Sequence, residues 1–179
     1  MRIALVDAGR NLNKDLAGGF GTASDFSRSI FLRLIRWIKK GMIRLPIMSL
    51  GYLSAILKGR GYDIFLSHGE EIEGVNMYLV YTSSVGYRYE IDFAQRIRKK
   101  GIVIGFIGPL ASAFPKMYLE YGNFIIKGEP EGIFKIADID ELKGIVELEK
   151  VRDLDALTFP DRSPFDYKNF SYSIFIRNR

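Results

Sequence analysis

The stretch from Phe106 to Gly132, FIGPLASAFPKMYLEYGNFIIKGEPEG, decides the fold, because it contains two apolar runs that each stop at small or helix-breaking residues. The run 102–107 stops at Gly108 and Pro109, and the run 123–126 stops just before Gly128. In a parallel α/β sheet such breaks fall at the carboxyl ends of strands, where the backbone can approach a ligand closely. The stretch therefore predicts two neighbouring strands with a binding crevice beside their ends.

The same alternation continues outward along the chain. Apolar runs predict strands over 2–6, 62–66, 77–82, 102–107 and 124–127. Helical periodicity predicts helices over 27–43, 47–58, 89–100 and 115–121, with a long Gly- and Asn-rich loop over 11–26. Alternating β and α elements predict an α/β fold, a doubly wound flavodoxin-like (Rossmann-like) five-stranded parallel sheet of order 2-1-3-4-5.

The pattern becomes weaker after Gly132. Residues 133–137 are predicted to complete a helix, and Gly144–Glu149 resembles a short edge strand. The segment 150–167, with Pro160 and Pro164, is predicted to be an extended linker, and residues 171–179 alternate like the start of another strand. We therefore expect one domain over 1–149, followed by a linker and the start of a further unit over 150–179.

Composition restricts the classes of protein to which the chain can belong. It has 179 residues, of which 47% are hydrophobic and 26% are charged, as in globular domains. It has no cysteine, which excludes disulfides, zinc-thiolate sites and cysteine-bound iron–sulfur clusters. No apolar run approaches the roughly 18 residues that span a bilayer, and the amino terminus begins with a predicted strand, so we expect a cytoplasmic protein.

Several motifs, taken in order, resemble the amino-terminal cobalamin-binding domain of cobalamin-dependent radical SAM enzymes. They are GP-x-AS at 108–112, P-x-x-x-L at 115–119 and an apolar strand closing in GE-x-E at 128–131. Residues 46–62 resemble that family's helix leading into the second strand, and Asp153–Arg162 resembles its linker toward the catalytic barrel. The resemblance covers most of the chain from Pro46 onward.

The resemblance implies a module that binds cobalamin and belongs to a methyltransferase-like enzyme. The 4Fe-4S iron–sulfur cluster and S-adenosylmethionine would be held by a carboxyl-terminal radical SAM domain, whose first strand residues 171–179 resemble. Because the chain has no cysteine, we expect it to be catalytically inert by itself.

The chain also departs from the family's motifs. Leu110 stands where members often have His, and Pro130 replaces a glycine of GEGE. The wider cobalamin-binding fold often has D-x-H-x-x-G after its first strand, and here Asp7 is kept while Gly9 replaces the cobalt-binding His. The resemblance then implies that no imidazole from that position binds the cobalt, and that the lower face of the cobalt is left to water or to Leu12.

The carboxyl ends of the strands supply the candidate cofactor site. Loops 7–11, 82–86 and 108–112 are expected to meet there, with 128–132 beside them. Since any doubly wound sheet ends its strands in such turns, the assignment to cobalamin rests on the resemblance. The candidate cofactor-binding residues are Asp7, Gly9, Leu12, Thr82, Ser83, Ser84, Gly108, Pro109, Leu110, Ala111, Ser112, Gly128, Glu129 and Glu131.

Alternative interpretations stay open at this stage. Leu110 and Pro130 favour a non-catalytic flavodoxin-like interaction or regulatory domain that has lost the cofactor. His68, the only histidine, follows the second strand rather than the first, so we expect it to have no cofactor role. The basic segment 27–44 is expected to be a solvated helix face, with membrane-surface contact as the less favoured alternative and nucleic acid not expected as a partner.

Overall fold

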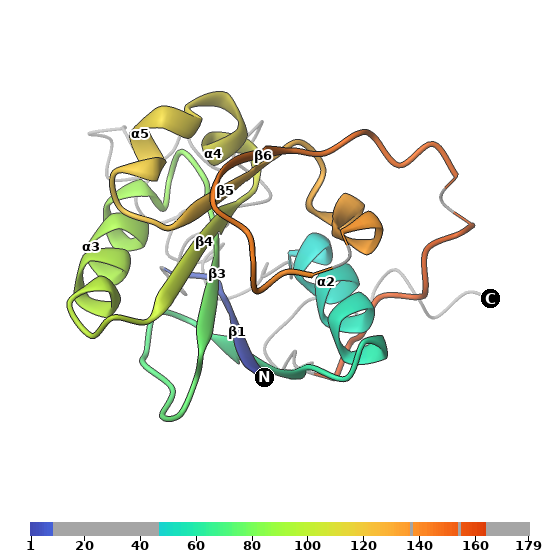
Figure 1. Cartoon of the computed structure of the whole chain (residues 1–179), viewed down its shortest axis with the longest axis horizontal. Coiled ribbons are helices and arrows are strands. Elements are labelled where there is room, and N and C mark those ends of the chain that lie inside the picture. Colours follow the sequence, from blue (N-terminus) through green and yellow to red (C-terminus); the bar gives the residue numbers. More distant parts are fainter. Residues whose placement is uncertain (9–46, 137, 154, 164–179) are drawn as a thin grey trace, which may run out of the picture.

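The computed structural model describes residues 1–8, 47–136, 138–153 and 155–163, and its core is one parallel sheet. Six strands stand in the order β2-β1-β3-β4-β5-β6, and every neighbouring pair is parallel (Figure 1). The strands are β1 (Arg2–Val6), β2 (Asp63–Ser67), β3 (Met77–Tyr81), β4 (Val103–Ile107), β5 (Phe124–Lys127) and β6 (Gly144–Glu147). The predicted α/β fold and the order 2-1-3-4-5 are confirmed, and so is the short edge strand expected over 144–149, which forms β6 beside β5; the count of five strands is therefore one too few.

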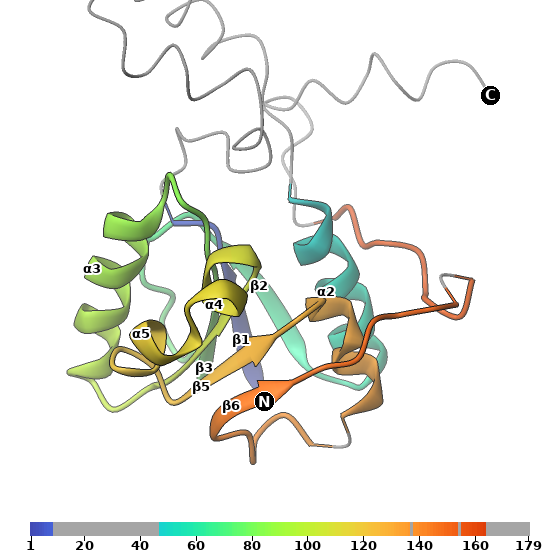
Figure 2. The same ribbon diagram turned by 90° about the horizontal axis from the view of Figure 1, so that it is seen from above.

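Helices cover both faces of the sheet, as expected for a doubly wound fold. They are α2 (Met48–Gly59), α3 (Tyr87–Arg98), α4 (Pro109–Ala113), α5 (Pro115–Leu119) and the 3-10 helix η2 (Pro130–Lys135). Figure 2 shows α2 on one side of the sheet and α3, α4 and α5 on the other. Two separate buried clusters result: one joins α2 and η2 to the sheet, and the other joins α3, α4 and α5 to it.

The central strands are apolar on both sides because both of their faces are covered. Residues 3–6 of β1 are at most 1% exposed, and such continuous apolar runs are typical of buried parallel strands. In β4, Gly105 makes room for a neighbour's ring, since a Cβ there would lie 2.2 Å from Cζ of Phe124. The apolar runs that predicted the strands are thus the two-sided core of the domain.

Some local predictions need correction. A separate helix, α4, begins at Pro109, where a loop was expected, and residues 130–135 form a 3-10 turn rather than a helix over 133–137. The predicted loop 11–26, the basic helix 27–43 and the strand 171–179 lie outside the described residues. None of the helices in the described part of the chain has the length and apolar character needed to cross a membrane.

The described part of the predicted linker folds back onto the domain. We call residues 155–163 the strap. Its Asp161 donates its N–H to the carbonyl of Gly51 at 2.9 Å, and its carboxylate accepts from Ser54 Oγ at 2.7 Å and Lys58 Nζ at 2.6 Å. The N–H of Ser163 binds the other carboxylate oxygen at 2.8 Å. The strap is therefore attached to α2 by the N–H and the carboxylate of Asp161, and Lys58 also donates to Ser163 Oγ at 3.1 Å.

The contacts of Asp161 determine the protonation state of its carboxyl group. Burial by itself would raise the pKa of this carboxyl, but hydrogen bonds from Lys58, Ser54 and Ser163 outweigh burial and hold the pKa well below its ordinary value of 3.8. Asp161 is thus a carboxylate throughout the neutral range, and the attachment of the strap is a charge-assisted contact.

Candidate functional site

The candidate site lies at the carboxyl edge of the sheet, where all six parallel strands end. The chain leaves β1 toward β2 on one side and leaves β3 toward β4 on the other, so the strand order reverses between β1 and β3. Open α/β sheets bind ligands outside the strand ends at such a switch point. Asp7 follows β1 there, and Thr82, Ser83 and Ser84 follow β3.

The hydroxyl of Thr82 is turned into the protein rather than toward the crevice. Thr82 is fully buried, and its Oγ1 donates to the carbonyl of Ile107 at 2.8 Å and accepts from the N–H of Ala111 at 2.9 Å. The residue thereby joins the end of β3 to the first turns of α4. Thr82, a candidate cofactor-binding residue, thus uses its only hydroxyl proton within the protein.

Ser83 is also bound internally, by a buried network that sequence reasoning missed. Glu90, in the first turn of α3, is fully buried and accepts from the Ser83 N–H at 3.0 Å, from Ser83 Oγ at 3.2 Å and from the hydroxyl of Tyr118 at 3.1 Å. Burial, together with the charge and the hydrogen bond of Glu90, raises the pKa of the Tyr118 hydroxyl. The network fixes the loop after β3, of which Ser84 is the exposed member.

The loops after β4 and β5 depend on glycine. Gly108 has φ of 101°, and a Cβ there would lie 3.0 Å from the carbonyl oxygen of Thr82. Gly128 has φ of 108°, and a Cβ would lie 2.7 Å from the carbonyl oxygen of Leu148. Only glycine adopts these conformations without strain, so both motif glycines have a structural role in bringing the strand ends close to their neighbours.

Two further motif residues bridge β4, β5 and the chain beyond β6. Ser112 Oγ accepts from the N–H of Gly128 at 3.0 Å, which ties α4 to the end of β5. The carboxylate of Glu129 accepts from the N–H of Val151 at 3.0 Å, while Glu131 is half-buried in η2. The carboxylate of Glu129, a candidate cofactor-binding group, is thus used within the protein.

The structure places His68 beside Asp7, contrary to the reasoning that set this histidine apart. Because β2 pairs directly with β1, the end of β2 lies next to the end of β1, and His68 Nδ1 is 3.9 Å from Asp7 Oδ2. Both side chains are about a fifth exposed. A position after the second strand is therefore no reason to exclude His68 from the site.

The candidate residues are thus gathered at one edge, but few of their polar groups face outward. Gly9 and Leu12 lie outside the described residues. Ala111 is buried against the sheet, whereas Ser84 and Pro109 are exposed and Leu110 is half-buried. The described surface of the site therefore consists of backbone, the apolar side chains of Pro109 and Leu110, the hydroxyl of Ser84 and the partly exposed pair of Asp7 and His68.

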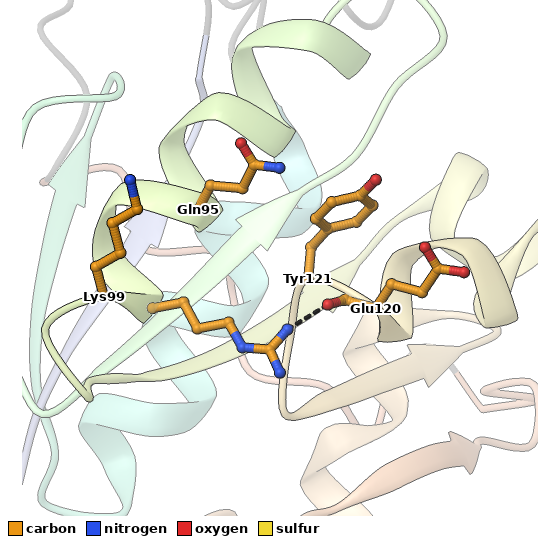
Figure 3. Close-up of a pocket in the computed structure, with 5 residues that line it drawn as sticks. Gln95, Lys99, Glu120 and Tyr121 are labelled. Atoms are coloured by element: carbon orange, nitrogen blue, oxygen red, sulfur yellow. Dashed lines mark hydrogen bonds between the residues drawn. The ribbon is translucent and has the colours of Figure 1, made fainter.

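A hollow of about 500 Å³ lies elsewhere, near the end of α3, and no candidate residue lines it. Its walls are Gln95, Arg98, Lys99, Glu120 and Tyr121 (Figure 3). Arg98 donates to the carbonyl of Glu120, the residue that caps the carboxyl end of α5. Since the negative ends of α3 and α5 meet there, these cations complement helix termini, and the hollow has a structural explanation.

Within the described residues, no group of three or more His, Asp or Glu side chains is arranged to hold a metal ion. Comparison with known proteins adds no identification: no family model, no curated protein and no solved structure matches the chain. The class that the structure defines is therefore that of a doubly wound α/β domain whose strand order reverses between β1 and β3.

Proposed function

We propose that this chain is a cobalamin-binding module, the amino-terminal part of a cobalamin-dependent radical SAM enzyme of the methyltransferase-like type. The observation that carries the proposal is the meeting of the motif segments at one edge. The segments that begin at Asp7, Thr82, Gly108 and Gly128 follow strands β1, β3, β4 and β5, and they occur in the order in which the family resemblance requires them.

The residues fit such a ligand through shape more than through polar contacts. A corrin is large and flat, so it needs close approach of the backbone, which strand ends with Gly108 and Gly128 allow. Ser84, Pro109, Leu110 and the partly exposed Asp7 and His68 are described side chains that could touch it. In this class the corrinoid supplies a methyl group; the chain's own part would be to bind and orient it.

The chemistry itself would belong to the carboxyl-terminal barrel, with its iron–sulfur cluster and S-adenosylmethionine. The chain has no cysteine with which to hold that cluster. The strap would then belong to the segment that connects the module to the barrel, and Asp161 would hold this segment against α2.

A specific observation favours the second candidate, an interaction or regulatory domain without a cofactor. Thr82, Ser83, Ser112 and Glu129 all use their polar atoms within the protein. In a domain that has lost its ligand, these polar atoms would serve only the stability of the fold.

Cobalamin binding separates the two candidates. The purified chain is incubated with hydroxocobalamin and desalted, and the retained corrinoid is measured by its absorbance. We expect the wild type to retain it and Ser84→Trp, which places a bulky group on the exposed loop after β3, to lose it. Asp92→Trp, on the exposed side of α3, is the matched control and should retain it. Failure of the folded wild type to retain any corrinoid supports the interaction domain instead.

The same complex tests the lower face of the cobalt. We expect the electron paramagnetic resonance spectrum of cob(II)alamin on the protein to show no nitrogen splitting from an imidazole, because Gly9 stands at the family's histidine position. A nitrogen splitting that disappears in His68→Ala would contradict this expectation and assign the ligand to the histidine beside Asp7.

A further inference from the structure

The outer edge of β6 leaves backbone hydrogen-bonding groups open. Gly144 donates its N–H to the carbonyl of Asn123 at 3.0 Å, and Leu148 donates to that of Lys127 at 2.8 Å, so the even-numbered residues face β5. Successive residues of a strand turn these groups to opposite sides. Ile145 and Glu147 therefore turn theirs away from the sheet, where no backbone hydrogen bond joins them to the described residues.

An apolar side chain accompanies these open groups. Ile145 is 41% exposed, although it stands in register with the buried Ile125 of β5. It lies at the centre of a short segment with alternating character, Lys143-Gly144-Ile145-Val146-Glu147. An exposed strand edge with an apolar residue is a template for pairing with another strand.

We propose that this edge pairs with the same edge of a second copy of the chain, antiparallel, around a two-fold axis at Ile145. In that register Ile145 faces Ile145 of the second copy, and Lys143 faces Glu147 of the second copy. Glu147 also accepts from Lys127 of its own chain at 2.9 Å, but its side chain is 71% exposed and its second oxygen can accept from Lys143. Symmetry repeats the charge pair, so two oppositely charged cross-strand pairs flank one apolar contact. The two sheets then form one sheet of twelve strands, six from each copy.

The charges outside this segment do not oppose the pairing. Glu141 and Glu149 would come opposite one another if both strands continued straight. Glu141, however, lies in the turn before β6, and Glu149 is paired with Lys135 at 3.4 Å within its own chain. The complementary region is therefore confined to residues 143–147.

Pairing of β6 with β6 of a second copy fits the two edges of the sheet better than pairing of β6 with β2 of a second copy. A contact of β6 with β2 of another copy joins two different surfaces, and such contacts continue into open filaments unless they close into a ring. The other edge, β2, has apolar residues of its own, but it carries no Lys or Arg that could pair with Glu147. A two-fold pairing of β6 closes with two copies (Figure 2 shows β6 at the border of the sheet).

The test measures the mass of the full chain by light scattering after gel filtration, over a wide range of concentration. We expect a dimer. Ile145→Lys, which opposes two ammonium groups at the axis, should give a monomer, while the control Tyr89→Lys, at an even more exposed site on α3, should stay dimeric. A monomeric wild type, or a dimer unaffected by Ile145→Lys, overturns the proposal.

A charge exchange gives a second, independent readout. Lys143→Glu alone should raise the dimer dissociation constant roughly tenfold or more, because it replaces two attractive pairs by two repulsive ones. Glu147→Lys should do the same, and the double variant should recover the dimer. Melting temperatures establish that each variant is folded. If the folded double variant stays as weak as the single ones, the register around Ile145 is wrong.

Discussion

Replacing Asp161 by alanine tests how much the strap contributes to the stability of the domain. The substitution removes the acceptor for Ser54, which is fully buried, and for Lys58, whose side chain is 41% exposed. A hydrogen bond to a charged group contributes about 1.5–3 kcal/mol when buried, and an exposed ion pair about 0.2–1 kcal/mol. We therefore expect the free energy of unfolding to fall by roughly 2 kcal/mol, and the melting temperature by roughly 4–8 °C in a chain of this size.

The assay is urea unfolding of the wild type and Asp161→Ala, with Ser54→Ala as the partner in a double-mutant cycle. Because Ser54 and Asp161 share one hydrogen bond, their effects should be less than additive. Trypsin cleavage after Arg162 should also become faster in the variant, since the strap loses the carboxylate contacts that hold it to α2. Full additivity in the cycle, or unchanged stability and cleavage, would refute the reasoning.

The pH dependence follows from the same contacts. Because the pKa of Asp161 in the folded chain lies below its ordinary value of 3.8, the carboxylate stabilises the fold fully above that value. The stability difference between the wild type and Asp161→Ala should stay constant near neutral pH and shrink as the pH falls below about 4 toward the folded pKa. A difference that grows on acidification contradicts this sign.

Three further predictions concern the core and the site. Gly105→Ala should lower the free energy of unfolding by about 1–3 kcal/mol in denaturant unfolding, since the new Cβ meets the ring of Phe124. Gly59→Ala is its control and should show no loss, because a Cβ at position 59 would have no heavy atom within 4 Å. Thr82→Val should lower the free energy of unfolding by about 1–3 kcal/mol, because the carbonyl of Ile107 and the N–H of Ala111 lose a buried partner. Thr82→Ser, which keeps the hydroxyl, should retain most of the stability. The isolated chain should form no 5′-deoxyadenosine from S-adenosylmethionine under reducing conditions, since it has no cysteine for a cluster; product formation without an added partner protein would contradict this.

The strands could be predicted from the sequence because they are buried on both faces. Continuous apolar runs that stop at Gly and Pro, as at Gly108 and Gly128, identify strands and their carboxyl ends without any knowledge of packing. The five-residue helix α4 could not be recognised in this way, because Gly108-Pro109 is also typical of a turn and so short a helix has no periodicity.

The contacts within the site could not be read from the sequence because they join distant residues. Glu90 looks like one more charged residue of an amphipathic helix, yet it is fully buried beneath Ser83. Asp161 binds Ser54 across 107 residues of chain. The proximity of His68 and Asp7, by contrast, was available from the predicted order, since strands 2 and 1 are neighbours and their ends must meet.

The position of β1 has a consequence for how the chain acquires its structure. Ile3 pairs with Ile64 on one side and with Met77 on the other, so both neighbours of the first strand come from later in the chain. The pairings of β3 with β4, β4 with β5 and β5 with β6 are much more local. Because closing short loops costs less entropy than closing long ones, we expect the half from β3 to β6 to assemble first. The amino-terminal strand, although synthesised first, would then insert among the last, and its apolar residues would have to be shielded from aggregation during that interval.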